Sequence, residues 1–142
     1  MNILVINGPN LNLLGIRETQ IYGSESLDEI MTWLENSIEG IKHNFKFYQS
    51  NAEGELINIM QEERHWANGI LINAGAFSHY SHAIADTISA IQIPTIEIHM
   101  SNINERENFR KKSVLKKVCI QSIIGLGKHS YLKGLEYFNK IS

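Results

Sequence analysis

Short apolar runs alternate with segments of helical periodicity along the sequence, and this alternation limits the possible folds more than any other feature. The runs at Ile3–Ile6 and Gly69–Asn73 are apolar almost throughout, which is typical of strands covered on both faces. Segments with apolar residues at helical spacing follow each of them. Because strands that alternate with helices pair in parallel, the pattern predicts an α/β fold with helices on both faces of one sheet.

Local signals place the individual elements. A capping box at Ser26 and Glu29 begins a helix with apolar residues from Leu27 to Ile38, and Pro94 precedes a strand. Further strands are expected at Phe45–Ser50, Thr95–His99 and Val118–Ile124, and further helices at Glu55–Trp66, His82–Ile91, Glu105–Arg110 and Tyr131–Ile141. Five strands in a chain of this length predict a flavodoxin-like three-layer sandwich with strand order 2-1-3-4-5.

Length and composition exclude several classes of protein. With 142 residues, the chain is expected to form one domain over residues 1–142. The formal net charge is -2, so the chain lacks the excess of basic residues typical of nucleic-acid-binding proteins. No apolar run approaches the roughly 20 residues that span a bilayer. Cys119 is the only cysteine, which fits a reducing compartment, and the first strand leaves no room for a signal peptide. A cytoplasmic protein is therefore expected.

Polar side chains follow three of the predicted strands. In the predicted strand order, the carboxyl ends of neighbouring strands meet at one edge of the sheet, where α/β folds bind their ligands. The side chains brought to that edge are Asn7 and Asn10 after the first strand, Asn73 and His79 after the third, and His99 and Ser101 after the fourth. This convergence predicts a binding or catalytic site.

Tyr22 and Arg17 lie five residues apart in the long loop that follows the first strand. A phenol is a poor base near neutral pH, but a nearby guanidinium favours the phenolate form. The pair could therefore supply a general base with a charge partner. Taken alone, the pair fits a half-buried tyrosine beside a surface arginine better.

His99 has Glu97 two residues before it, and residues two apart in a strand point to the same face. The carboxylate could fix the imidazole tautomer and keep a proton available for donation. A surface histidine beside a surface glutamate is the alternative. Arg106 and Arg110 share one face if their segment is helical, and could clamp an anionic or hydroxylated ligand.

Other ligand classes find less support. His79 and His82 have a spacing that can bind metal, but no third ligand cluster accompanies them. No glycine-rich nucleotide motif follows the first strand, so no cofactor is expected. A flavodoxin-like module that binds a flavin or a phosphorylated signal remains an alternative, as does a catalytically silent assembly protein.

Longer motifs make the chain resemble the type II dehydroquinases, or 3-dehydroquinate dehydratases. The resemblance extends from about residue 2 to the last helix. The matching segments are Asn7-Gly8-Pro9-Asn10-Leu11-Asn12-Leu13-Leu14-Gly15, Arg17-Glu18, Tyr22-Gly23, Gln49-Ser50-Asn51, Glu53-Gly54, Ile72-Asn73-Ala74-Gly75-Ala76-Phe77-Ser78-His79, Ile96-Glu97-Ile98-His99-Met100-Ser101-Asn102-Ile103 and Arg106-Glu107 with Phe109-Arg110.

The resemblance implies dehydration of 3-dehydroquinate to 3-dehydroshikimate without metal, organic cofactor or Schiff-base lysine. Tyr22 would remove the proton alpha to the ketone, with Arg17 favouring its phenolate. Polar groups and a water near Asn10 would stabilise the enolate. His99, oriented by Glu97, would protonate the departing hydroxyl.

Substrate contacts are implied in the same way. Asn73, His79 and Arg110 would hold ring hydroxyls, and Met100 and Ser101 would hold the carboxylate. A dodecamer of four trimers is implied, in which Asp86 would reach the site of a neighbouring subunit. The reaction belongs to the shikimate pathway of aromatic amino-acid biosynthesis, and quinate breakdown uses the same step.

The chain departs from the family pattern at several positions. The departures are Thr19, Ala74, Tyr80, Ala85, Asn104-Glu105 and Gln121. Thr19 lacks the fixed φ of the usual proline, so a more mobile loop is expected. Ala85 and Gln121 bear on subunit packing.

Overall fold

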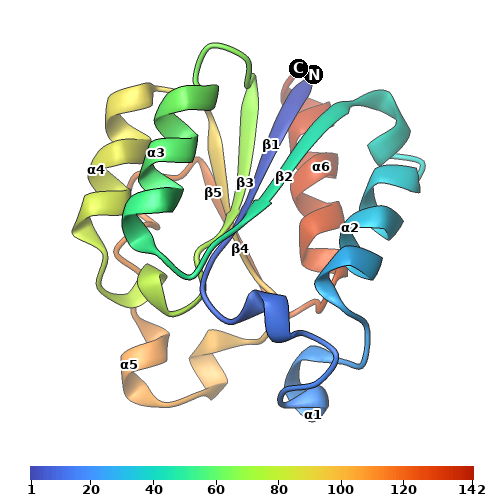
Figure 1. The fold of residues 1–142 in the computed structure, drawn as a ribbon, viewed down its shortest axis with the longest axis vertical. Coiled ribbons are helices and arrows are strands. Elements are labelled where there is room, and N and C mark those ends of the chain that lie inside the picture. Colours follow the sequence, from blue (N-terminus) through green and yellow to red (C-terminus); the bar gives the residue numbers. More distant parts are fainter.

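The computed structural model describes residues 1–142 and contains a five-stranded parallel sheet in the order β2-β1-β3-β4-β5 (Figure 1). The strands are β1 (Asn2–Asn7), β2 (Asn44–Gln49), β3 (Gly69–Asn73), β4 (Thr95–His99) and β5 (Gln121–Ile124). This order confirms the predicted flavodoxin-like fold. It also sets the carboxyl ends of β1 and β3 side by side, with Asn7 opposite Asn73 in the register.

Helices cover both faces of the sheet. The α-helices are α1 (Thr19–Tyr22), α2 (Leu27–Asn36), α3 (Glu53–Glu63), α4 (His82–Ile91), α5 (Asn108–Lys111) and α6 (His129–Ile141). The 3-10 helices are η1 (Leu11–Leu13), η2 (Gly40–Lys42), η3 (Gly75–His79) and η4 (Ile103–Glu105). Figure 1 shows α3 and α4 on one side of the sheet, and α2 and α6 on the other. No helix is long and apolar enough to cross a bilayer.

Two apolar cores lie on the two faces of the sheet. Alternate residues of β1 point to opposite faces, as the period of a strand requires. Ile3 and Val5 pack in the core that includes α2 and α6, whereas Leu4 and Ile6 pack in the core that includes α3 and α4. All four are fully buried. Burial on both faces explains why the run is continuously apolar.

Several predicted boundaries were wrong. The helix expected up to Ile38 ends at Asn36, because Ser37 adopts an extended backbone with φ -67° and ψ 161°. Ile38 therefore leaves the apolar face and is 76% exposed. The last strand begins at Gln121 rather than Val118, since the chain makes turns over the preceding residues.

The segment Glu105–Arg110 is not one helix. Its first residue closes η4, and a separate turn, α5, begins at Asn108. Arg106 lies between the two in an extended conformation, with φ -103° and ψ -170°. The two arginines of this segment therefore do not share a helical face, although both reach the same pocket.

The carboxyl ends of the strands open toward α1 and α5 at the lower end of Figure 1. β1 leaves the sheet there through Gly8, whose N–H donates to the Asn73 carbonyl at 2.8 Å. A Cβ at Gly8 would lie 2.6 Å from the carbonyl carbon of Ala74. Only glycine permits this close approach, which holds the exits of β1 and β3 together.

Gly8→Ala should lower the free energy of unfolding by roughly 3 kcal/mol, because the new methyl group meets backbone that has no room to move. Urea unfolding followed by circular dichroism measures the change. Gly54→Ala is the matched control, since a Cβ at this exposed helical position meets nothing within 4 Å. It should be neutral or slightly stabilising. Equal midpoints for the two variants would contradict the close-approach account.

Candidate active site

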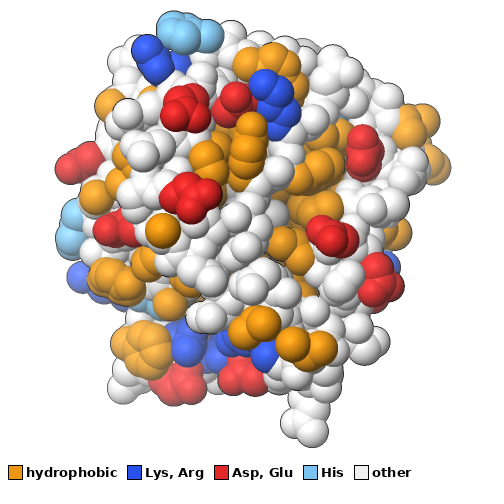
Figure 2. Space-filling model, in the orientation of Figure 1, with side chains coloured by type: hydrophobic (Ala, Val, Ile, Leu, Met, Phe, Trp, Pro, Cys, Tyr) orange, Lys and Arg blue, Asp and Glu red, His pale blue; other side chains and the backbone are white.

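One pocket opens beyond the carboxyl ends of β1, β3 and β4. Of the predicted site residues, Asn7, Asp86 and Glu97 do not line it, whereas the following do: Asn10, Arg17, Tyr22, Asn73, His79, His99, Met100, Ser101 and Arg110. Arg106 also lines it. Figure 2 shows basic side chains set among apolar and acidic ones at this end of the molecule. Three arginines around one pocket give it an affinity for anions.

Tyr22 stands between two arginines. The Arg106 Nη1 donates to the Tyr22 hydroxyl at 2.6 Å, and the Arg106 side chain is only 13% exposed. The Arg17 guanidinium carbon lies 4.7 Å from the centre of the Tyr22 ring. Arg17 also pairs with Glu18 at 3.2 Å. The direct partner of the phenol oxygen is therefore Arg106, and Arg17 contributes its charge from the ring face.

From the sequence, Arg106 is either half of an anion clamp with Arg110 or part of a solvated charged face, and its contact with Tyr22 was missed. The two residues are 84 positions apart, so no local spacing indicates the contact. Arg106 also reaches the Ser101 hydroxyl, with Nη1 at 3.5 Å. It thus connects the loop that carries the phenol to the turn that follows β4.

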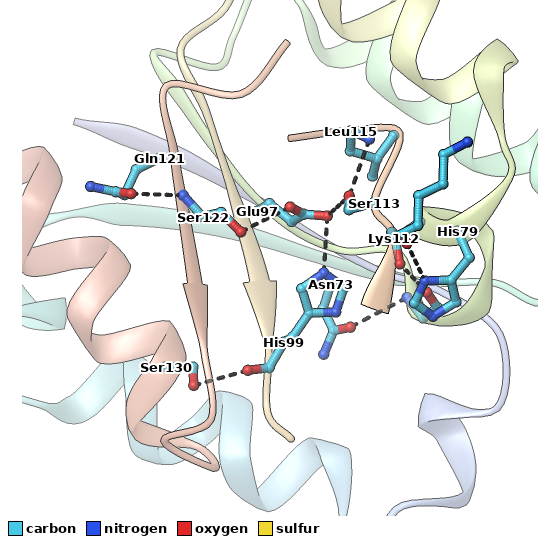
Figure 3. Close-up of polar contacts among 12 residues, drawn as sticks. Asn73, His79, Glu97, His99, Lys112, Ser113, Leu115, Gln121, Ser122 and Ser130 are labelled. Atoms are coloured by element: carbon cyan, nitrogen blue, oxygen red, sulfur yellow. Dashed lines mark hydrogen bonds and ion pairs between the residues drawn. The ribbon is translucent and has the colours of Figure 1, made fainter. Parts of the chain in front are cut away.

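His99 and Glu97 form a buried pair on β4. The His99 Nε2 lies 2.9 Å from the Glu97 carboxylate, and both side chains point to the same face of the strand (Figure 3). Because the carboxylate accepts a hydrogen bond, Nε2 carries the proton. Nδ1 has no hydrogen-bond partner in the chain and is left for a ligand in the pocket.

The Glu97 carboxylate is completely buried and fully engaged. Ser122 on β5 donates to it at 2.9 Å, and Ser113, which follows α5, also donates (Figure 3). Burial alone would raise the pKa of Glu97, but the hydrogen bonds and the charge of His99 outweigh burial and hold the pKa below its usual value. Glu97 therefore remains an anion behind His99.

His79 is held by the segment next to Ser113. Its Nδ1 donates to the Lys112 carbonyl at 2.7 Å (Figure 3). Its ring stacks near His99, with centroids 6.4 Å apart. Burial lowers the pKa of His79, and the nearby His99 and Arg110 act in the same direction, against the hydrogen bond to Lys112. A neutral His79 presents Nε2 to the pocket as an acceptor.

The turn after β4 offers backbone donors. The N–H groups of Met100, Ser101 and Asn102 donate to no acceptor within the chain. Consecutive unpaired N–H groups beside a hydroxyl can hold a carboxylate. Across the pocket, Asn10 adopts a left-handed backbone with φ 68°, and its N–H donates to the Asn51 side chain at 2.9 Å. Arg110 pairs with Glu107 at 2.8 Å.

The family model described as Dehydroquinase class II matches residues 1–139. The chain belongs to the class II dehydroquinase family. A 3-dehydroquinate dehydratase of Fusobacterium nucleatum subsp. nucleatum is 48% identical over 147 residues, covering 99% of this chain and 100% of that protein. One of Trichodesmium erythraeum is 51% identical over 135 residues, covering 95% and 90%.

Solved structures agree with this assignment. The crystal structure of a type II dehydroquinase from Butyrivibrio crossotus superimposes with a TM-score of 0.94 at 44% identity, covering 98% of this chain and 97% of that one. In the present chain, Thr19 is the first residue of α1. The family resemblance leads us to expect proline there. Proline is favoured at that position of a helix. Greater mobility of the loop stays a prediction.

Two residues that the sequence suggested as ligand-binding candidates, Asp86 and His82, lie away from the pocket. Asp86 is exposed on α4 and does not line the pocket of its own chain. His82 is also exposed, and no three His, Cys, Asp or Glu side chains are arranged to hold a metal ion.

Burial, together with the charge of Glu97, raises the pKa of the Cys119 thiol to about 12.

Glu97→Gln should destabilise the fold at neutral pH by about 2 kcal/mol, since it removes a charge that three donors satisfy. The native carboxyl has a pKa below that of the unfolded chain, so its stabilisation is complete above the unfolded value of 4.5 and is lost as the pH falls through the native value. Urea unfolding at several values between about pH 3 and 8 measures the difference in unfolding free energy from wild type.

The control is Glu62→Gln, which changes an exposed glutamate that makes no ion pair. Its difference from wild type should stay near zero at all pH values. A difference for Glu97→Gln that does not shrink toward acid pH would contradict the proposed origin of the stabilisation.

Proposed function

We propose that the chain is a hydro-lyase that dehydrates 3-dehydroquinate to 3-dehydroshikimate, with Tyr22 as base and His99 as acid. The observation that carries the proposal is the opposite electrostatic setting of these two groups in one pocket. Tyr22 contacts guanidinium groups, whereas His99 is backed by a buried carboxylate. Environments that favour opposite protonation states assign the acid and base roles. The relatives named 3-dehydroquinate dehydratase support the substrate.

Tyr22 acts first in this mechanism. The charges of Arg106 and Arg17 stabilise the phenolate, which takes the proton from the carbon alpha to the ketone. The electron pair of that C–H bond forms the enolate. Polar groups and a water near Asn10 stabilise the negative charge on the enolate oxygen. Both arginines hold their charge throughout, because guanidinium does not deprotonate in proteins.

His99 completes the elimination. The enolate collapses, the bond between carbon and the departing hydroxyl breaks, and His99 donates a proton from Nδ1 so that water leaves. Glu97 stabilises the imidazolium before the step and keeps Nε2 protonated after it. Exchange with solvent returns the proton from Tyr22 and restores one to His99, so the enzyme is unchanged overall.

Substrate binding uses the remaining polar groups. The turn at Met100 and Ser101 takes the substrate carboxylate through its free N–H groups and the Ser101 hydroxyl. Asn73, His79 and Arg110 hold the ring hydroxyls. Asn73 and His79 follow β3, the carboxylate turn follows β4, and Arg110 lies in α5. The ring is therefore held from several sides and the reacting carbon is placed against Tyr22.

Assembly completes the proposal. We place Asp86 at the site of a neighbouring subunit, since it is exposed on its own chain and lies outside its own pocket. A dodecamer of four trimers in the cytoplasm is the expected form. Sedimentation velocity tests this expectation, and a monomer at micromolar concentration would contradict it.

Addition of 3-dehydroquinate to the purified protein should produce the absorbance of a conjugated enone. Tyr22→Phe should lower kcat by at least about 10³-fold, because it removes the proposed base. Binding of a carbocyclic acid, measured by calorimetry, should remain close to wild type. No product from folded wild-type protein would exclude the dehydratase, and near-normal turnover of Tyr22→Phe would exclude the phenolate base.

Arg106→Gln should reduce kcat more than Arg17→Gln, because Arg106 contacts the phenol oxygen and Arg17 contacts only the ring. Loss of this charged hydrogen bond should cost about 10²-fold. Arg64→Gln serves as control, because Arg64 is exposed directly after α3 and does not line the pocket. A larger loss for Arg17→Gln than for Arg106→Gln would show that the ring-face charge dominates.

A further inference from the structure

A buried tyrosine joins the ends of β1 and β3 behind the pocket. Tyr131 lies in α6, has no exposed surface and does not line the pocket. Its hydroxyl lies 2.7 Å from the Asn7 Oδ1 and 2.9 Å from the Asn73 Nδ2. Asn7 and Asn73 are opposite each other in the register of the two strands, so one hydroxyl spans both side chains.

The direction of these hydrogen bonds is fixed at both ends. At one end, the N–H of Gly75 donates to the Asn73 Oδ1 at 3.3 Å. At the other, the Asn7 Nδ2 points to the sulfur of Met31 at 3.6 Å. Flipping both amides would set a donor of Asn73 against the Gly75 N–H and leave the Asn7 oxygen facing a group that cannot donate.

The hydroxyl has a single proton to share. It donates that proton to Asn7, so it can only accept from Asn73. Full burial raises the pKa of Tyr131 far above its usual value, which keeps the hydroxyl protonated at every working pH. The Asn73 amide is therefore held with its NH2 group toward Tyr131 and its oxygen toward Gly75.

We propose that Tyr131 is a positioning residue that locks the Asn73 amide in one orientation toward the substrate. The inference rests on the proposed function, in which Asn73 holds a ring hydroxyl. With one N–H and one oxygen lone pair already engaged, Asn73 presents one remaining N–H and one remaining lone pair. A hydroxyl, which both donates and accepts, matches that pair. A freely flipping amide would match it only part of the time.

Tyr131→Phe removes the hydroxyl and keeps the ring. We expect kcat/KM for 3-dehydroquinate to fall about tenfold, with most of the change in KM, because the lost orientation weakens a substrate contact rather than the acid or base. Tyr137→Phe is the matched control on the same helix, since the Tyr137 hydroxyl makes no hydrogen bond in the structure. It should stay within about twofold of wild type.

A double-mutant cycle separates positioning from a general loss of structure. In an Asn73→Ala background, Tyr131→Phe should have almost no further effect on kcat/KM, because its route to the substrate is already gone. An undiminished tenfold loss in that background would overturn the proposal, as would wild-type kcat/KM for Tyr131→Phe alone. Thermal unfolding of each variant shows that the compared proteins are folded.

If Tyr131→Phe does not fold, Asn7→Ala decides the question. This variant removes the acceptor of the tyrosine proton, which leaves the hydroxyl free to turn toward the Asn73 oxygen and reverse the amide. It should raise KM although Asn7 lies outside the pocket, and the effect should vanish in the Asn73→Ala background. An unchanged KM would overturn the proposal. Inactive wild-type protein would instead reject the proposed function, and this role of Asn73 with it.

Discussion

The buried carboxylate of Glu97 is the constraint on which the site depends. An anion with no exposed surface is tolerated only when donors surround it, and here they come from His99, Ser113 and Ser122. These donors lie on β4, on β5 and after α5, so satisfying one charge fixes three segments at once. The same segment after α5 places the Lys112 carbonyl against His79. One buried charge thus orients both histidines of the pocket.

The half of the site around Tyr22 is built differently. Tyr22 sits in α1, a single short turn in the segment after β1, and contacts no strand residue through a hydrogen bond. Its hydroxyl is held by Arg106, which is anchored beside the turn after β4. Positive charge therefore gathers around the phenol, while negative charge lies behind the imidazole. This division supports the proposed roles of Tyr22 as base and His99 as acid in one small pocket.

The sequence predicted those features that follow from period and strand order. Continuous apolar runs predicted the central strands, and polar residues at strand ends predicted the convergence of Asn73 and His99 on one edge. Features set by distant contacts could not be predicted in this way. Arg106 meets Tyr22 only because the turn after β4 folds over the loop, and Tyr131 bonds Asn73 only because α6 packs on that face of the sheet. The early end of α2 depends on the backbone of Ser37, which helical periodicity does not report.

The central claim is that Glu97 holds a proton on the Nε2 of His99 and so leaves Nδ1 to exchange a proton with substrate. Long-range proton–nitrogen NMR of protein labelled with nitrogen-15 in histidine measures the tautomer of His99 directly. The account predicts that neutral His99 carries its proton on Nε2, with a downfield proton signal typical of a hydrogen bond to a carboxylate. A neutral His99 protonated on Nδ1, with Nε2 free, would contradict it.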